Sequence, residues 1–245
     1  MALPKIATPF YEMKLPSSGA TIKYRPFLVK EEKLLLMAME SGEQTEISNV
    51  MKQIIGNCTD NKVDVESIPM FDIEYLFLQL RIKSIDDFAE ISLKCQECQE
   101  SFTSKIDLKT VGVKGAKEKQ DFKIQLTSDV GMIMKYPTLD MMENMKAGDE
   151  KKSAFIFNTI TKCVASIYDE EQVYDDFTKE EIDEFVESLP QEQFKKISDF
   201  FENMPKLQHT VKYSCPKCSK KNKITITGLQ DFFDSPSLTT TWKTW

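Results

Sequence analysis

The sequence predicts an α+β fold in which a helical middle lies between β-hairpins. Three observations lead to this fold class. Short runs of alternating apolar and polar residues flank turn signals near both ends of the chain. In the middle, apolar residues recur every three to four positions, the helical period. Two C-x-x-C motifs also lie between strand-like runs, which predicts a pair of cysteine-tipped hairpins.

The composition is that of an ordinary globular protein. The 245 residues include only 8 glycines, are 29% charged and carry a formal net charge of −7. This length allows one large or two small domains with a sizeable core, and it excludes collagenous and wholly disordered chains. The sequence pI near 5.0 argues against a general binder of nucleic acid or of anionic membranes, because phosphate groups attract an excess of Lys and Arg.

The N-terminal region predicts a hairpin followed by a helix. Residues 10–27 alternate in polarity around a Pro-Ser-Ser-Gly turn, in which Gly19 is free to take a positive φ. The run 29–41 then predicts a helix, since Glu31 and Glu32 suit the positive end of a helix dipole.

Two more helices and a linker are expected next. A short helix over residues 46–55 is predicted to stop at Gly56 and Asn57. The apolar run 71–85 is too long for most strands and predicts a buried helix. Residues 111–120 contain two glycines and four charged residues, which favours a linker or a long exposed loop.

The second half of the chain predicts one strand and several helices. Residues 122–126 favour a strand, 132–145 a partly helical, Met-rich segment, and 153–168 one helix. Thr178 followed by Glu181 forms a capping box at the start of another helix.

One further helix is expected before the second cysteine motif. Ser188 is a candidate start, with Pro190 in the first turn and Gln191 three residues on, and the helix should end before Pro205. The whole pattern suggests three parts: residues 1–110, residues 121–233 and a tail over 234–245. We expect them to pack as one structural unit through a shared metal ion.

Six cysteines require an explanation. The N-terminus lacks the features of a secretory signal, and no apolar stretch is long enough for a membrane helix. An intracellular, reducing setting is therefore expected, in which paired cysteines favour metal binding over disulfides. The paired cysteines are Cys95, Cys98, Cys215 and Cys218.

These four thiolates predict one structural zinc site of the zinc-ribbon kind. Each pair sits between strands, at 90–94 and 101–108 and at 210–214 and 223–227, so two knuckles can supply a tetrahedral four-sulfur site. Because such a site has no open coordination position, the zinc would hold structure and not carry out chemistry. Unmetallated thiols, two separate sites and a redox motif are the alternatives, although redox motifs usually open a helix.

The other reactive residues give weaker signals. Cys58 and Cys163 lie in apolar, helix-like surroundings and are expected to be buried. His209 is either an alternative ligand or a partly exposed strand residue. No P-loop, glycine fingerprint or nucleophile–base pair is present, so no catalytic residue can be named. A lysine cluster near the second motif leaves nucleic-acid contact as an alternative: Lys212, Lys217, Lys220, Lys221 and Lys223.

Several segments together resemble a known family. The segment 15–40 near the start, the paired cysteine hairpins and the segment 226–233 are similar to the baseplate hub assembly proteins of T-even-like contractile-tailed bacteriophages. The blocks YRPFLVKEEK (24–33) and GLQDFF (228–233) are the most specific parts.

The resemblance implies a non-enzymatic role as an assembly factor, or chaperone, for the central hub of the baseplate. The expected partners are hub and tape-measure proteins, with self-association left open, and the expected place is the host cytoplasm. Two alternatives are kept: a structural hub component retained in the virion tail, and a zinc-ribbon protein that binds nucleic acid. The family supplies no catalytic residues, and it matches the four paired cysteines as ligands only.

Overall fold

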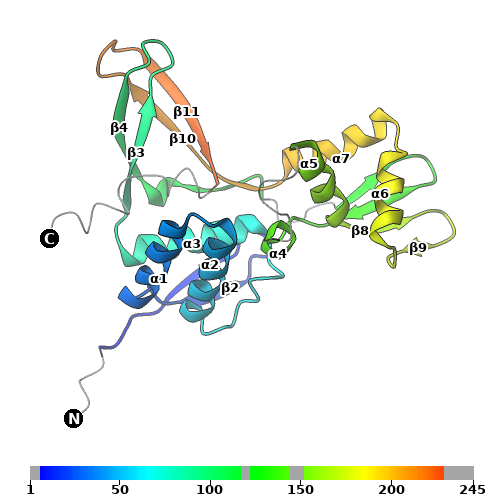
Figure 1. Ribbon diagram of the computed structural model, residues 1–245, viewed down its shortest axis with the longest axis horizontal. Helices are drawn as coiled ribbons and strands as arrows, with labels where there is room; N and C mark the ends of the chain where they lie inside the picture. Colours follow the sequence, from blue (N-terminus) through cyan, green and yellow to red (C-terminus); the bar gives the residue numbers. More distant parts are fainter. Residues whose placement is uncertain (1–5, 117–121, 144–151, 229–245) are drawn as a thin grey trace.

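The structure is a computed structural model that describes residues 6–116, 122–143 and 152–228. Three parts are visible in it: a helical body, two long hairpins that stand on this body, and a separate lobe beyond them (Figure 1). The mixture of helices and sheets confirms the predicted α+β class. The predicted tail over 234–245 lies outside the described residues.

The helical body begins with the predicted hairpin. Its turn contains Gly19 at φ 68°, a conformation that glycine adopts without steric cost. Three helices follow, and the third is buried on nearly all sides, as the continuous apolar run predicts. The elements of the body are β1 (Tyr11–Lys14), β2 (Thr21–Tyr24), α1 (Val29–Ser41), α2 (Gln44–Cys58) and α3 (Met70–Ser84).

Helix α2 does not stop at Gly56 and Asn57, and this prediction was wrong. The helix continues to Cys58, and the chain turns at Asp60 and Asn61, both of which have φ 54°. The Asn61 N–H donates to the Gly56 carbonyl at 2.8 Å and closes the helix end. A side chain on Gly56 would clash with Asn61, since a Cβ there would lie 2.7 Å from its Oδ1. Gly56 thus leaves space for Asn61, and the turn at Asp60 and Asn61, not Gly56, ends the helix.

The two cysteine motifs lie at the tips of antiparallel hairpins, as predicted. The strands of the first hairpin are β3 (Phe88–Lys94) and β4 (Ser101–Asp107), and those of the second are β10 (Lys206–Ser214) and β11 (Lys221–Thr227). The hairpins stand side by side with their tips together (Figure 1).

The expected linker over 111–120 was partly wrong. Its first residues follow a short 3-10 helix (Leu108–Thr110) and form strand β5 (Gly112–Lys114), which pairs with the start of β10. Backbone pairing of β5 therefore anchors the second hairpin beside the end of the first. Residues 117–121 lie outside the described part of the chain.

Strands β6–β9 and helices α5–α7 form the part that we call the distal lobe. The sheet order is β6-β7-β8-β9, and every neighbouring pair is antiparallel. Helix α4 (Leu139–Glu143) lies between β7 and α5 in the chain; its Leu139 belongs to the core of the helical body, and its Met141 packs against the core of the lobe. The elements of the lobe are β6 (Lys123–Gln125), β7 (Gly131–Met134), α5 (Lys152–Lys162), β8 (Val164–Tyr168), β9 (Val173–Tyr174), α6 (Lys179–Glu187) and α7 (Gln191–Asn203).

The structure contradicts two predictions for this lobe and refines a third. The single helix over 153–168 was wrong, because Val164–Tyr168 forms a strand that pairs with β7. Ser188 ends α6 and does not begin α7, which starts after Pro190. The Met-rich segment 132–145 begins in strand β7 and continues into helix α4, and its last two residues lie outside the described range. The strand at 122–126 and the end of α7 before Pro205 are confirmed.

Two hydrophobic clusters hold these parts. One cluster joins α1–α3 to the inner faces of both hairpins, including Ile91, Leu93, Val211 and Ile226. The other contains distal-lobe residues alone, from Ile124 to Ile197. The domain division at residues 110 and 121 remains a prediction. None of the described helices is long and apolar enough to span a bilayer.

Candidate metal centre

Each cysteine motif forms a tight turn that closes its hairpin. In the first, the Cys95 N–H donates to the Glu100 carbonyl at 2.8 Å, and the Gln99 N–H donates to the Cys95 carbonyl at 3.0 Å. Gln99 takes the left-handed conformation, with φ 60°. This conformation turns the chain back into β4 immediately after Cys98, so both thiols stay on one side of the turn.

The second turn repeats the first, residue for residue. The Cys215 N–H donates to the Lys220 carbonyl at 3.0 Å, and the Ser219 N–H donates to the Cys215 carbonyl at 2.9 Å. Ser219 has φ 58°, at the same offset from its motif as Gln99. The two hairpins thus present their thiols in the same local geometry.

Aromatic packing brings the two hairpins together below their tips. The rings of Phe102 and Tyr213 lie 5.2 Å apart, between β4 and β10. The Tyr213 hydroxyl donates to the Lys94 carbonyl at 3.5 Å, one residue before Cys95. Leu93 and Val211 are buried beside them in the shared core. This packing fixes the distance between the turns, and hence the distance between the sulfur pairs.

The structure brings all four predicted cysteines together, and their sulfur atoms all lie within 4.8 Å of one another. The Sγ atoms of Cys95 and Cys218 are 3.7 Å apart, and those of Cys98 and Cys215 are 3.6 Å apart. These separations are too long for disulfides, and all four thiols are free. A tetrahedron with metal–sulfur bonds of about 2.3 Å has edges of roughly 3.8 Å, so the arrangement suits a four-coordinate ion.

The turn backbone acts directly on the thiols. Hydrogen bonds from the backbone N–H groups of Cys218 and Lys217 lower the pKa of Cys215 to about 7. Burial of the thiol raises its pKa, but the hydrogen bonds outweigh this effect. At Cys98 the backbone N–H of Glu100 also lowers the pKa, but desolvation and the neighbouring thiols outweigh it and raise the pKa to about 12. The cluster therefore holds one easily ionised thiol, Cys215, beside Cys98 and Cys218, whose pKa values are raised. A bound cation would favour the thiolate form of such a group.

Charged side chains connect the two turns crosswise. The Lys217 Nζ lies 2.8 Å from a Glu100 carboxylate oxygen, and Lys220 pairs with Glu97. Glu97 and Lys217 occupy equivalent positions in the two motifs, as do Glu100 and Lys220. The first turn thus carries negative charge and the second positive charge, and each ion pair joins the middle of one turn to the end of the other.

These ion pairs give part of the lysine cluster a structural role, as links between the two turns. Two of its five lysines face carboxylates of the first hairpin, while Lys212, Lys221 and Lys223 remain exposed along the second. Glu97 and Glu100 lie on either side of Cys98 in the sequence, but their pairing with the lysines was not predicted. The equal offsets in the two motifs were the signal that could have found the pairs.

The remaining candidate residues lie apart from the sulfur cluster. His209 is half-buried on β10 and pairs in register with Ile226. Cys58 and Cys163 are buried, as expected, and burial raises the pKa of these thiols to about 11 and about 12. Within the described ranges, the four paired cysteines form the one group of three or more Cys, His, Asp and Glu side chains placed to hold an ion.

Comparison with known proteins agrees with the resemblance seen in the sequence. Residues 8–234 match the family described as T4 bacteriophage base plate protein. No curated protein and no solved structure matches the chain. The family match covers both cysteine hairpins, the helical body and the distal lobe. Since this match spans most of the sequence, the chain belongs to the T4 bacteriophage base plate protein family.

Proposed function

We propose that this protein is a non-enzymatic assembly factor for the central hub of the phage tail baseplate. It acts in the cytoplasm of the infected host, where it holds hub or tape-measure proteins during assembly. The match to the baseplate family over residues 8–234 is the observation that carries this proposal. The structure adds a scaffold with two separate hydrophobic clusters, a form suited to contact with more than one partner surface.

A structural zinc ion belongs to this proposal. Cys95, Cys98, Cys215 and Cys218 would hold it, because four cysteine sulfur atoms within 4.8 Å of one another match the ligand set of structural zinc. A bound zinc supplies a cross-link and no chemistry at such a site, since no coordination position stays open. Between Cys98 and Cys215, which it would join, lie 116 residues of the sequence. The ion would therefore fix the hairpins, and with them the chain before and after the distal lobe.

Co-expression with the hub and tape-measure proteins of the same phage tests the function. We expect one of them to co-purify with the protein in a pull-down, and to remain less aggregated in its presence than when expressed alone. Retention of none of these proteins by the tagged chain, at low and at moderate salt, would contradict the proposed function.

A structural component that is retained in the virion is the second candidate, because membership of the baseplate family fits this role as well. Mass spectrometry of purified virions separates the two. An assembly factor is absent from mature particles or present far below the stoichiometry of the tail, whereas a structural component is present in a fixed number of copies.

Nucleic-acid binding receives less support from the geometry. Lys217 and Lys220 are paired with carboxylates, and the acidic first hairpin lies against the basic second one. Phosphate binding would need to displace these pairs or rely on the three other lysines. Binding curves with duplex and single-stranded DNA at low salt should therefore stay flat.

A further inference from the structure

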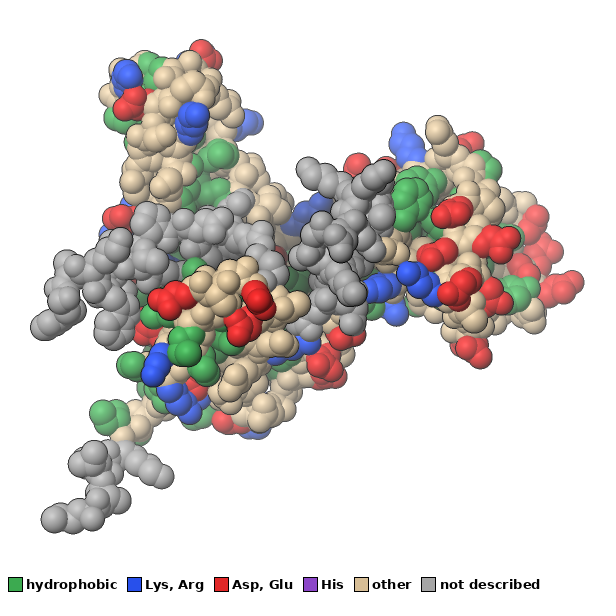
Figure 2. All heavy atoms as spheres, viewed as in Figure 1, with side chains coloured by type: hydrophobic (Ala, Val, Ile, Leu, Met, Phe, Trp, Pro, Cys, Tyr) green, Lys and Arg blue, Asp and Glu red, His purple; other side chains and the backbone are tan. Residues whose placement is uncertain are grey.

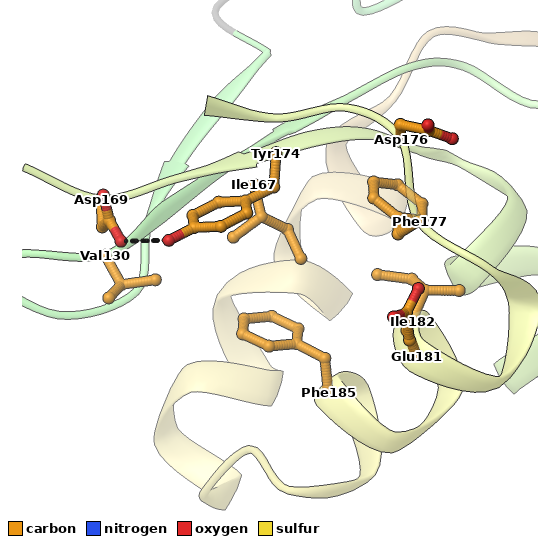
Figure 3. A pocket seen from close by; sticks show the side chains of 9 residues that line it. All are labelled: Val130, Ile167, Asp169, Tyr174, Asp176, Phe177, Glu181, Ile182 and Phe185. Atoms are coloured by element: carbon orange, nitrogen blue, oxygen red, sulfur yellow. Dashed lines mark hydrogen bonds between the residues drawn. The ribbon is translucent and has the colours of Figure 1, made fainter. Parts of the chain in front are cut away.

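The distal lobe contains an apolar groove with acidic side chains around it. The groove has a volume of about 380 Å³ and lies between the sheet β6–β9 and helix α6 (Figure 3). Its apolar lining comes from the sheet, from the loop before α6 and from α6 itself: Val130, Ile167, Tyr174, Phe177, Ile182 and Phe185. Three carboxylates, those of Asp169, Asp176 and Glu181, complete the lining.

The groove opens beside the edge of a sheet. Strand β9 is the last strand in the order β6-β7-β8-β9, and no strand pairs with its outer edge in the described residues. Val173 is 61% exposed and Tyr174 is 41% exposed. Because Tyr174 pairs in register with Ile167, the two side chains lie on the same face of the sheet, the face that α6 covers. A strand added to β9 would thus point every second side chain into the groove.

Negative charge is concentrated around this edge. Residues 169–187 contain ten of the 39 Asp and Glu residues of the chain, and only one of the 32 Lys and Arg residues. The space-filling view shows many Asp and Glu side chains on the surface of the distal lobe (Figure 2). Asp169 and Glu181 are oriented by local hydrogen bonds, from Gln172 and Tyr174 and from Thr178 respectively. Asp176 is exposed and makes no hydrogen bond or ion pair among the described residues.

We infer that the groove and the free edge of β9 bind an extended segment of a partner protein in which apolar side chains alternate with Lys or Arg. The apolar side chains fill the groove, the partner backbone pairs with β9, and the basic side chains reach the carboxylates around it. The inference deepens the proposed function, on which it rests, by naming the kind of partner segment that the protein holds.

A second copy of the distal lobe fits this surface poorly. Symmetric pairing through β9 would bring two segments with ten carboxylates each against one another. Like charges at such an interface oppose association. A basic partner neutralises the surface instead, and its attraction to this surface weakens as salt screens the charges.

Fluorescence anisotropy with a synthetic peptide tests the inference on the full chain. The probe is a labelled peptide of about ten residues that alternates lysine with valine and carries one central phenylalanine. We expect saturable binding that weakens at least tenfold when salt is raised from low to physiological concentration. Two matched peptides serve as controls: one replaces every lysine with glutamate, and the other replaces the apolar residues with serine. Equal binding of all three peptides, or of none, would overturn the inference.

Two variants locate the binding site. Asp176→Lys changes an exposed, unpaired carboxylate beside the groove, and should weaken peptide binding at least fivefold with an unchanged melting temperature. Glu40→Lys makes the same charge change on α1 in the helical body, and should leave binding unchanged. Equal effects of the two variants would mean that net charge alone attracts the peptide, and would contradict a site at the groove.

The hub pull-down separates the failure of this inference from the failure of the proposed function. If a hub or tape-measure protein co-purifies equally well with the wild type and with Asp176→Lys, the function stands and the groove is not its site. If the peptide binds at the groove but no such protein is retained, the groove binds basic segments and the proposed function is wrong. Concentration-dependent dimers in light scattering that Asp176→Lys strengthens, by removing like-charge repulsion, would assign the edge to a second copy and would also overturn the inference.

Discussion

Four sulfur atoms from two distant segments meet at the tips of the hairpins, and each depends on its own backbone turn. Gln99 and Ser219, both in the left-handed conformation, return the chain to the second strand and keep the paired thiols together. Neither residue is glycine, so each turn carries some steric cost. A metal ion that joins the turns would stabilise a conformation that these residues adopt less readily by themselves.

The first prediction at this scale concerns the ligands. Cys95→Ser or Cys218→Ser should abolish stoichiometric zinc binding and lower the free energy of unfolding by several kcal/mol, since structural zinc sites contribute roughly 10 kcal/mol or more to folding. Elemental analysis and thermal melts measure the two effects. Cys58→Ala, which removes a buried thiol far from the cluster in sequence, should keep one zinc ion per chain. An unchanged melting temperature in Cys95→Ser would reject the link between metal and folding.

A second prediction concerns the crosswise ion pairs. Lys220→Glu places a carboxylate against Glu97 beside the thiol cluster, and should lower the melting temperature by a few degrees. Both side chains are 52% exposed, so solvent screens the pair and its contribution to stability is small. The double exchange Lys220→Glu with Glu97→Lys restores opposite charges and should recover most of the loss. A double variant no more stable than the sum of its single changes would show that the pair is not coupled.

A third prediction concerns Glu31, whose side chain is fully buried in α1. Burial raises the pKa of this carboxyl, but hydrogen bonds from Arg25 and the Leu28 N–H, together with nearby positive charge, outweigh burial and hold the pKa below its ordinary value of 4.5. A lowered folded-state pKa stabilises the fold above pH 4.5, and this stability is lost as the pH falls through the folded-state value.

Glu31→Gln should therefore cost about 3 kcal/mol at neutral pH, because it leaves the nearly buried Arg25 without its carboxylate. The variant should also lose part of the decline in stability below pH 4.5, as measured by urea unfolding across pH. Glu32→Gln, the next residue of the same helix, is the matched control and should keep the wild-type pH dependence.

At the scale of secondary-structure elements, α6 depends on its capping box. The Thr178 hydroxyl accepts the Glu181 N–H at 3.2 Å, and the Glu181 carboxylate accepts the Thr178 N–H at 2.7 Å. Helix α6 has only nine residues, so its ends matter more to it than to a long helix. It also forms one wall of the groove, and its position bears on the surface that we infer for a partner.

Thr178→Ala should destabilise the distal lobe by about 0.5–2 kcal/mol, the usual cost of a lost cap. Thr178→Ser keeps the hydroxyl and should lie within a few tenths of a kcal/mol of the wild type. Chemical denaturation followed by far-UV circular dichroism measures both. Equal stability of the alanine and serine variants would show that the cap does not limit this helix.

At the scale of the whole molecule, the two hydrophobic clusters share no residue, yet the chain passes from one to the other and back. The second hairpin belongs to the cluster of the helical body, although the distal lobe precedes it directly in the sequence. The sulfur cluster lies where the tip of the β3–β4 hairpin, which precedes the distal lobe in the chain, meets the tip of the β10–β11 hairpin, which follows it. A metal ion bound there would therefore stabilise the long-range pairing of the two hairpins, and not the interior of the distal lobe.

Calorimetry should accordingly show two unfolding transitions. Removal of zinc with a strong chelator should lower the transition of the helical body and hairpins, while the transition of the distal lobe stays within a degree or two. Thr178→Ala should do the reverse. A single transition that shifts as a whole under both changes would mean that the two clusters unfold together.

Local signals in the amino-acid sequence were enough to predict both cysteine hairpins, the start of α6 and the four clustered cysteines. Alternation and turn residues predicted both cysteine hairpins, and Thr178 with Glu181 predicted the start of α6, because these signals act within a few residues and need no distant partner. The spacing of Cys95, Cys98, Cys215 and Cys218 identified the cluster, since each motif forms the same turn in its own hairpin.

Features that depend on partners far away in the sequence could be seen only once the chain was folded. Val164–Tyr168 is a strand because β7 lies beside it to take its hydrogen bonds, although its apolar pattern continues that of helix α5. Residues 112–114 are a strand because β10 pairs with them, and α2 passes Gly56 because Asn61 folds back onto it. The pairing of Lys217 with Glu100, and the acidic groove beside β9, likewise exist only once packing brings separate elements together.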